Sequence, residues 1–469
     1  MTSHAPSTQL TRSDYKTLGL SALGGALEFY DFIIFIFFAK VLGELFFPPG
    51  IPEWTRQLQT FGIFAAGYLI RPLGGIVMAH FGDLLGRKRM FALSIGLMAL
   101  PTLAIGVLPT YAQIGVAAPL LLLTMRLLQG AAIGGEVPSA WVFVAEHVPA
   151  RRTGLACGTL TAGLAAGVLL GSLSAGALNR AFSSDQIAEY AWRLPFLAGG
   201  IFGLLSVYLR RWLHETPVFA ELVAMRALAR ETPLKVVLRD HPRSLAMSLW
   251  LTWVIAAAVL VVSLMTPTLL QSAYGYPAPV ALQANLLAVL LQAIGSVVVG
   301  ALSDRWGNGR VLLAGSVCLG ISAWLFYRFA GAPHLLFPLY ALLGAALGVL
   351  GAIPRVMVEA FPPVVRLSGV SFAYNLGYAV FGGLTPLLVV MLLKQHPMGP
   401  AYYVILLASI GAMVGARLAQ RERINRRGCS ATAPAGVRQC GRRAPRNITR
   451  YSPTTHTNAA DQPPRMSDG

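Results

Sequence analysis

The sequence has 469 residues, of which 55% are hydrophobic and 12% are charged, whereas ordinary soluble domains carry about 25% charged residues. This balance excludes a soluble globular domain and predicts an all-helical (all-α) integral membrane protein with many spans. The formal net charge of +18 does not indicate nucleic-acid binding, because most basic residues before the C-terminal tail lie in alternate connections between apolar runs.

Twelve apolar runs follow one another along the chain, each of a length and composition typical of a transmembrane helix. Several contain Gly or Pro, which spans tolerate where neighbouring helices satisfy the freed main-chain groups. A hydropathy window of about 19 residues places the spans of the first half at 20–46, 59–81, 90–109, 115–145, 154–178 and 191–212, and those of the second half at 245–272, 279–302, 310–330, 334–357, 368–393 and 400–418.

The basic residues predict the orientation of the spans. Arg87 to Arg89 follow the second run, Arg151 and Arg152 follow the fourth, and many Arg and Lys residues fill the connection after the sixth. Cytoplasmic loops carry the excess of Lys and Arg, so we expect both termini and the central connection to be cytoplasmic. The expected location is the bacterial inner (cytoplasmic) membrane.

A repeated motif divides the chain into two halves. GDLLGRKR (82–89) follows the second run, and SDRWGNGR (303–310) follows the eighth, which is the second run of the second half. Two six-helix halves with a site between them near the bilayer mid-plane form a known transporter architecture. The expected organisation is a cytoplasmic N-terminal segment (1–17), a first six-helix half (18–212), a central cytoplasmic loop (213–243), a second six-helix half (244–418) and a disordered basic cytoplasmic tail (419–469).

The motifs resemble those of one protein family. AHFGDLLGRKR (79–89) resembles the signature loop of the major facilitator superfamily. Seven further motifs, each in the expected place, resemble its metabolite:proton symporter branch. They are ALEFYDF, RPLGG, RLLQGAAIGGE, AEHVPARRTG, WRLPF, ETPVF and SGVSFAYNLGYAVFGGLTP. The resemblance implies twelve transmembrane helices in two pseudo-symmetric halves. It also implies alternating-access symport of a proton with a small organic acid or a zwitterionic osmolyte, as in the proline/betaine, citrate, 2-oxoglutarate and shikimate transporters.

The resemblance further implies a cytoplasmic gate at the signature loop. An Asp at one helix end can face the positive N-terminus of another helix, and the contact can break when the halves rock. The gate residues would be Asp83, Arg87, Lys88 and Arg89, with Asp304 and Arg305 as a weaker second copy.

The motifs leave some other classes of function open and argue against others. Sugar porters and drug/proton antiporters of the same superfamily remain alternatives. The chain has no GxxxxGK(S/T) motif, so we expect a gradient to drive transport, and one proton supplies about 2.3 kcal/mol per 100 mV. No catalytic constellation, metal-binding spacing or cofactor motif stands out, so we expect neither an enzyme nor a cofactor. The expected partners are a small metabolite, a proton and the lipid bilayer, and the expected working form is a monomer.

Two carboxylates in the first run are the leading candidates for proton coupling. GGALEFYDFIIFIFFA (24–39) carries Glu28 and Asp31, which are three residues apart and share a helix face. An acid at the centre of a span costs about 2.5–3.5 kcal/mol and is a functional candidate. We expect Asp31 to carry the proton, with Glu28 and Glu136 as further candidates. The alternative is that the pair in the first run is solvated near the cytoplasmic end or only structural.

The fourth run supplies the expected partners of these acids. Arg126, Gln129 and Glu136 lie near one helix face. An unpaired buried Arg is costly, so we expect Arg126 to pair with Asp31 or Glu136 or to contact an anionic substrate. The alternative is an ion pair that only fixes helix packing.

Polar residues near the ends and in the second half complete the set. Tyr374 and Asn375 lie inside the eleventh run and are candidate substrate contacts, although polar side chains in spans more often hold helices together. Arg355 and Glu359, four residues apart, predict an internal pair. His147, at the end of the fourth run, has a titration range suited to proton traffic, and the alternative there is a loop ion pair.

Overall fold

The computed structural model describes residues 10–210, 215–224 and 232–431, and every regular element in these ranges is a helix. Contacts within the chain divide it into two compact units, Met1–Gln420 and Arg421–Gly469. The first unit contains two helical bundles, one from each half of the chain. We call them the first bundle and the second bundle.

The first bundle runs from the N-terminal helix to the end of the sixth span. Thr11 caps its first helix by accepting from the Asp14 N–H at 3.2 Å, and the Thr11 N–H donates to the Asp14 carboxylate at 2.7 Å. Its helices are α1 (Arg12–Phe37), α2 (Ala39–Phe46), α3 (Glu53–Leu69), α4 (Arg71–Leu85), α5 (Arg87–Val107), α6 (Tyr111–Ile114), α7 (Ala117–His147), α8 (Thr153–Ala181), α9 (Ser184–Gln186), the π-helix η1 (Ile187–Ala191) and α10 (Arg193–Arg210).

Two short helices and then the second bundle follow. The connection after the first bundle contains α11 (Pro217–Ala224) and α12 (Pro233–Asp240). The helices of the second bundle are α13 (Pro242–Val259), η2 (Leu260–Met265), α14 (Thr266–Tyr274), α15 (Ala278–Trp306), α16 (Asn308–Phe329), α17 (Pro333–Leu347), η3 (Gly348–Ala352), α18 (Ile353–Glu359), η4 (Pro363–Val365), α19 (Arg366–Gly377), η5 (Tyr378–Gly382), α20 (Gly383–Gln395) and α21 (Gly399–Ala431).

The helices account for all the predicted spans. Within the described residues, 10 helices are long and apolar enough to cross a membrane, or 11 if the bent pair Ser184–Ala191 and Arg193–Tyr208 is one span. The shorter apolar helix Leu93–Val107 lies at the predicted third run. Each predicted run therefore has a helical counterpart in the same order, and the all-helical fold class is confirmed.

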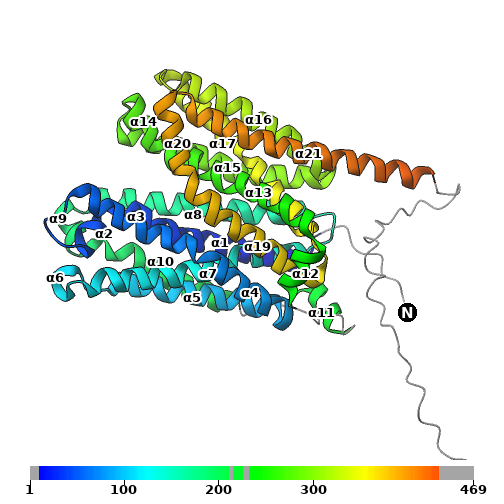
Figure 1. Ribbon diagram of the computed structural model, residues 1–469, viewed down its shortest axis with the longest axis horizontal. Helices are drawn as coiled ribbons and strands as arrows, with labels where there is room; N and C mark the ends of the chain where they lie inside the picture. Colours follow the sequence, from blue (N-terminus) through cyan, green and yellow to red (C-terminus); the bar gives the residue numbers. More distant parts are fainter. Residues whose placement is uncertain (1–9, 211–214, 225–231, 432–469) are drawn as a thin grey trace, which may run out of the picture. The chain divides into compact units, whose positions relative to one another are not determined.

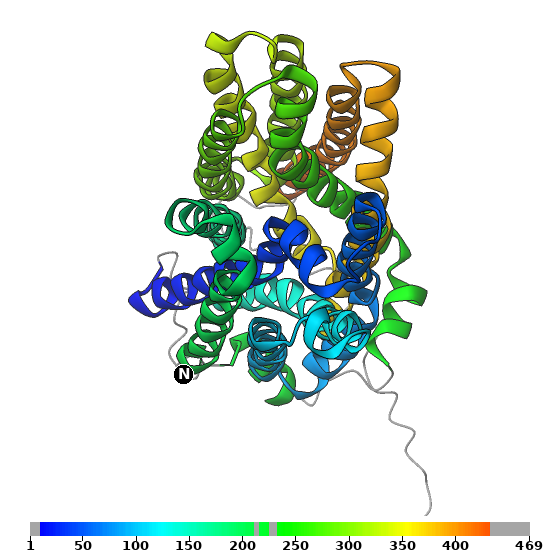
Figure 2. The ribbon, with the colours of Figure 1, turned by 90° about the vertical axis from the view of Figure 1, so that its left-hand side faces the viewer.

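The long helices lie side by side, and the short ones mark the two ends of the bundles. Helices α2, α6, α9 and α14 lie at one end, whereas α11 and α12 lie at the other (Figure 1). We call the latter the connection end. Figure 2 looks along the helices and shows the first bundle, mainly blue to cyan, below the second bundle, mainly green to orange.

Glycine residues allow the two bundles to meet at main-chain distance. A Cβ atom at Gly300 of α15 would overlap the carbonyl oxygen of Gly154 and lie 3.0 Å from the Cα atom of Gly158, both on α8. Helix α19 crosses α4 and α7 in a similar way, because the Ser371 hydroxyl donates to the carbonyl of Gly75 at 3.0 Å. Small residues and such hydrogen bonds are what holds spans together in a bilayer.

Two spans of the second bundle contain a π-helical turn. In η2 the main-chain oxygen of Val262 accepts from the Tyr340 hydroxyl at 2.5 Å, and that of Val261 accepts from the Thr266 hydroxyl at 2.7 Å. These bonds satisfy carbonyl groups that the turn removes from the regular helical pattern. The second turn, η5, begins at Tyr378 near the middle of the eleventh span. Turns of this kind occur frequently at functional sites.

Candidate functional site

Three acidic side chains line one small cavity of the first bundle. Glu28 and Asp31 come from α1 and Glu136 from α7, and these residues are 5%, 2% and 0% exposed. The other lining residues belong to α1, α5 and α10, so the whole lining comes from the first bundle. The cavity volume is about 10 Å³, which is about the space that one water molecule needs. In this conformation the cavity has room for water and a proton, and no room for a metabolite.

Packing of α10 against α1 sets the position of Asp31. The Tyr30 hydroxyl donates to the main-chain oxygen of Pro195 at 3.1 Å. A Cβ atom at Gly199 of α10 would overlap the Asp31 carboxylate oxygen Oδ1. The absence of a side chain at this position is therefore what gives the carboxylate its space.

Arg126 lies inside α7 with its guanidinium group between two aromatic rings. The residue is 0% exposed. Its Cζ atom is 4.7 Å from the ring centroid of Phe35 and 4.7 Å from that of Phe64. Both distances are within the range of a cation–π interaction, which is strongest when the cation is removed from water.

Gln129 joins Arg126 to the neighbouring helix α5. Its Oε1 accepts from Arg126 Nη1 at 3.0 Å, and its Nε2 donates to the Thr102 hydroxyl at 2.8 Å. The structure thus brings together two residues that the sequence analysis singled out. The pairing of Arg126 with Asp31 or Glu136 stays a prediction.

A second buried cation stands at the start of α4, and the sequence analysis quoted it only as part of a motif. Arg71 is 1% exposed. Its Cζ atom lies 5.4, 5.3 and 4.5 Å from the ring centroids of Tyr68, Tyr374 and Tyr378. The signal that could have found it is the charge of the Arg-Pro pair inside the second apolar run, since intramembrane charges mark functional sites.

The two candidates from the second half, Tyr374 and Asn375, face the first bundle. Trp141 of α7 meets Tyr374 edge to face, with ring centroids 5.1 Å apart and planes at 83°. The Asn375 amide donates to the carbonyl of Gly134 at 2.5 Å, and its oxygen accepts from Arg71 Nε at 3.4 Å. Residues of both halves therefore meet around the Arg71 guanidinium.

At the connection end, Asp83 joins α4 to the start of α19. Its Oδ2 atom accepts from the N–H and the hydroxyl of Ser368 at 2.9 and 2.8 Å. Ser368 lies in the first turn of α19, where N–H groups have no acceptor within the helix and the helix dipole stabilises an anion. The contact crosses from the first bundle to the second.

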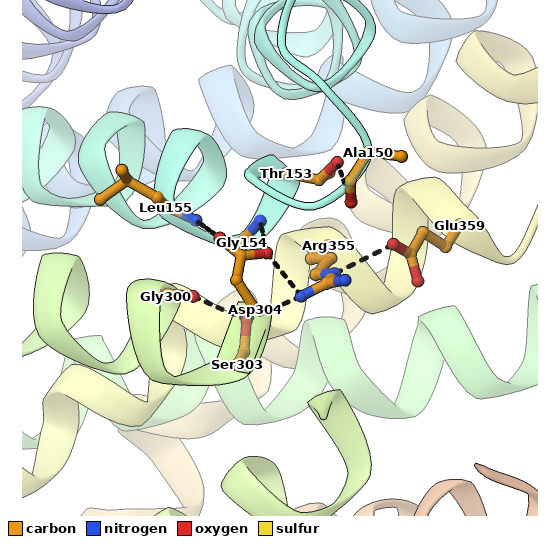
Figure 3. A network of polar contacts seen from close by, with 9 residues as sticks. All are labelled: Ala150, Thr153, Gly154, Leu155, Gly300, Ser303, Asp304, Arg355 and Glu359. Atoms are coloured by element: carbon orange, nitrogen blue, oxygen red, sulfur yellow. Dashed lines mark hydrogen bonds and ion pairs between the residues drawn. The ribbon is translucent and has the colours of Figure 1, made fainter. Parts of the chain in front are cut away.

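Asp304 makes the pseudo-symmetric contact in the opposite direction (Figure 3). Its two carboxylate oxygens accept from the N–H groups of Gly154 and Leu155 in the first turn of α8, each at 2.9 Å. Arg355 bonds to Asp304 at 2.8 Å and to Glu359 at 2.9 Å. The predicted pair of Arg355 and Glu359 is confirmed. We expected this second copy of the motif to be the weaker one. Its Asp304 carboxylate accepts from two N–H groups and pairs with a guanidinium group.

A third contact at the same end involves the central connection. Glu146 at the end of α7 bonds through Oε1 to Arg366 of α19 at 2.9 Å, and through Oε2 to the Thr216 hydroxyl at 2.9 Å. The adjacent His147 ring lies 2.9 Å from the main-chain oxygen of Phe143. The acidic group at this position therefore forms its ion pair with the other half of the chain.

The structure describes the side chains of only some of the basic residues in the two motif copies. The side chains of Arg87 and Lys88 lie outside the described residues, whereas Arg89 and Arg305 are exposed. Arg305 is in the last turn of α15, where a cation interacts favourably with the helix dipole. Across the part of the chain that the structure describes, no group of three or more His, Cys, Asp or Glu residues could hold a metal ion.

The sequence profile of the Major Facilitator Superfamily matches residues 22–386. This chain belongs to the major facilitator superfamily. It is therefore a multi-pass membrane transporter and not an enzyme.

Curated relatives within this superfamily cover most of the chain. It is 32% identical over 437 residues to the proline/betaine transporter of Salmonella typhimurium, with 88% of this chain and 84% of the relative covered. It is 31% identical over 420 residues to the glycine betaine/proline/ectoine/pipecolic acid transporter OusA of Dickeya dadantii, with 85% and 82% covered. These relatives agree with the metabolite:proton symporter branch that the motifs indicated.

A solved structure supports the superfamily fold. The proton:xylose symporter XylE bound to 6-bromo-6-deoxy-D-glucose matches with a TM-score of 0.71 and 16% sequence identity, over 86% of this chain and 94% of XylE. At this identity the likeness shows the fold alone. It confirms the twelve-helix, two-half architecture of the superfamily for this chain.

Proposed function

We propose that the chain is a proton-coupled symporter for a small zwitterionic osmolyte of the proline or betaine class. It would work by alternating access, as a monomer, in the bacterial inner membrane. The observation that carries the proposal is the water-sized cavity lined by Glu28, Asp31 and Glu136. The names of the two relatives support the substrate class.

Helix α7 connects the cavity to the region where the two bundles meet. Glu28, Asp31 and Glu136 line one cavity, and Glu136 lies on α7, whose Trp141 packs against Tyr374 of the second bundle. Like charges in so small a cavity repel one another, and a bound proton relieves the repulsion. Binding of a proton can therefore influence the side chains that surround Arg71.

The balance of buried charges favours a zwitterion with one proton. Three carboxylates, those of Glu28, Asp31 and Glu136, accompany the two guanidinium groups of Arg71 and Arg126. If all are ionised, one negative charge remains, and one proton neutralises it. A zwitterion adds no net charge, so the loaded carrier avoids the cost of an uncompensated charge in a low dielectric. An anionic organic acid, which the two arginines also suit, needs a second proton for the same balance.

The contacts at the connection end form the proposed cytoplasmic gate. Asp83 on Ser368, Asp304 on the start of α8, and Glu146 on Arg366 each join the two bundles. Rocking of one bundle against the other has to break all three. We infer that the connection end and both termini are cytoplasmic, and that the gate is closed in this conformation.

Proton movement in proteoliposomes tests the proposal. The vesicles contain a pH-sensitive dye, and glycine betaine, proline, citrate, 2-oxoglutarate or xylose is added outside. We expect the interior to acidify with a zwitterion. Asp31→Asn should abolish the acidification, whereas the matched control Asp185→Asn, at an exposed position, should preserve it.

The other outcomes are equally informative. Acidification that survives Asp31→Asn retains symport and moves the proton site to Glu28 or Glu136. Acidification with citrate or 2-oxoglutarate alone replaces the zwitterion by an organic acid. Exchange of labelled xylose, with no proton movement for any acid or zwitterion, contradicts the proposal and favours a sugar porter.

A further inference from the structure

Three tyrosine rings enclose the Arg71 guanidinium where the two bundles meet. Tyr68 comes from α3 of the first bundle, whereas Tyr374 of α19 and Tyr378 of η5 come from the second. The rings of Tyr68 and Tyr378 are nearly parallel, at 7°, with centroids 6.3 Å apart. The rings of Tyr374 and Tyr378 are 4.6 Å apart and tilted by 50°. We call Tyr68, Tyr374 and Tyr378 the tyrosine box.

The walls of the tyrosine box are suited to a cation. The Arg71 Cζ atom lies 4.5 to 5.4 Å from the three ring centroids, and a cation within about 6 Å of an aromatic face is attracted by the ring quadrupole. Tyr374 and Tyr378 are 1% and 6% exposed, so water does not weaken the attraction. A quaternary ammonium group has no N–H donor, and aromatic faces are the surface that binds it best.

The Arg126 guanidinium lies one aromatic ring away from the tyrosine box and is suited to bind an anion. Phe64 and Tyr68 are one turn apart on α3, with ring centroids at 5.2 Å. Phe64 also lies against the Arg126 guanidinium at 4.7 Å. The tyrosine box around Arg71 and the Arg126 guanidinium are therefore linked through two neighbouring rings of α3. A small zwitterion requires a cation site and guanidinium groups placed near one another in this way.

We propose that the tyrosine box is the cation subsite of the carrier and binds the quaternary or alkylated ammonium group of a zwitterion. Arg71 fills the box in the empty carrier. When the substrate enters, its ammonium group takes the place of the guanidinium, and Arg71 turns to the substrate carboxylate beside Arg126. The inference rests on the proposed function and specifies how that function selects its substrate.

The position of the rings gives this exchange a mechanical consequence. Two of the three walls belong to the second bundle, so a cation in the box attracts both bundles at once. Arg71 performs this role in the empty carrier, and the substrate performs it in the loaded one. Substrate recognition and closure of the bundles around the substrate are thereby one event.

Two ligands of the same shape and different charge provide the first test. In 3,3-dimethylbutanoate a neutral tert-butyl group replaces the trimethylammonium group of glycine betaine. Inhibition of labelled glycine betaine uptake into proteoliposomes by each unlabelled compound should differ by at least about tenfold. The tert-butyl compound lacks the cation–π attraction and the positive charge that balances its carboxylate. Equal inhibition by the two compounds overturns the proposal.

A matched pair of substitutions provides the second test. Tyr378→Leu removes the aromatic face, whereas Tyr378→Phe keeps it and loses only the hydroxyl. We expect Tyr378→Leu to raise the KM for glycine betaine roughly 5- to 30-fold. The KM of Tyr378→Phe should be at least about fivefold below that of Tyr378→Leu. In both variants kcat should change less than KM. The same pair at Tyr68 repeats the test from the first bundle. Equal KM values for the Leu and Phe variants contradict the proposal.

The outcomes separate this inference from the proposed function. If no zwitterion moves protons into the vesicles, the proposed function fails. If glycine betaine moves protons and yet the Leu variants bind it as well as the Phe variants, only the cation subsite is wrong. Should a Leu variant not fold, equal inhibition by the two ligands on the unaltered protein still overturns the inference.

Discussion

A single methyl group at Gly300 is expected to open the connection end of the carrier. A Cβ atom on Gly300 would overlap the carbonyl oxygen of Gly154 and lie 3.0 Å from the Cα atom of Gly158. Both contacts are with main chain, so no side chain can turn away, and α8 and α15 have to separate. Overpacking of this kind costs about 1–3 kcal/mol. The cost falls on the closed conformation, because the two helices belong to opposite bundles.

The native Cys157 reports the opening. It is 0% exposed and precedes Gly158 on α8, so alkylation by N-ethylmaleimide requires the helices to part. A shift of about 1–3 kcal/mol changes the population of the open form about 5- to 150-fold. We therefore expect Gly300→Ala to raise the alkylation rate of Cys157 by a factor in this range. The other three of the four cysteines are replaced by serine in every variant.

A glycine in open space is the control. An added Cβ atom at Gly383 of α20 would meet no atom within 4 Å, so Gly383→Ala should leave the alkylation rate unchanged. A Gly300→Ala variant that unfolds at the wild-type temperature and is alkylated at the wild-type rate refutes the reasoning. In that case the contact of α8 with α15 does not hold the closed form.

Two further substitutions test the cavity and the gate. Gly199→Ala would place a Cβ atom against the Asp31 carboxylate and should reduce proton-coupled uptake at least about tenfold. Gly176→Ala, in open space, should not, and equal uptake by the two variants would argue against a role for the position of Asp31. Arg355→Ala leaves the Asp304 side chain, which is 6% exposed, without its cation. The loss should destabilise the protein by about 3–5 kcal/mol, measured as a lower thermal unfolding midpoint in detergent. Adding Asp304→Ala should restore part of the loss, and a midpoint unaffected by Arg355→Ala would contradict the importance of the pair.

The sequence was sufficient for the fold because a bilayer restricts what can cross it. Main-chain polar groups in hydrocarbon have to be satisfied internally, so each apolar run of about 20 residues can be only a helix. The order and number of runs, and the repeated motif after the second and eighth, then led to the two-half architecture. The bend between Ser184–Ala191 and Arg193–Tyr208, at 45°, could not be predicted, because hydropathy measures length and not direction.

The candidate site was predictable only in part. Charges in apolar runs are costly, so Glu28, Asp31 and Arg126 were identifiable from their positions alone. The sequence analysis gave Arg71 no role, because an Arg-Pro pair inside a span is equally compatible with a purely structural motif. The gathering of Glu28 and Asp31 with Glu136 around one cavity also needed the structure, since α1 and α7 are distant in sequence.

The sequence by itself determined which segments are long and apolar enough to cross the membrane and which residues are charged within them. Only the tertiary structure decided which helix faces which. Asn375 and Arg71 meet although 304 positions separate them, and Glu146 bonds to Arg366 across 220 positions. The physical reason is that helical periodicity defines the polar face of each span. The partner of that face depends on how closely two helices approach, and this depends on glycines such as Gly75 and Gly300 and on the packing of both bundles together.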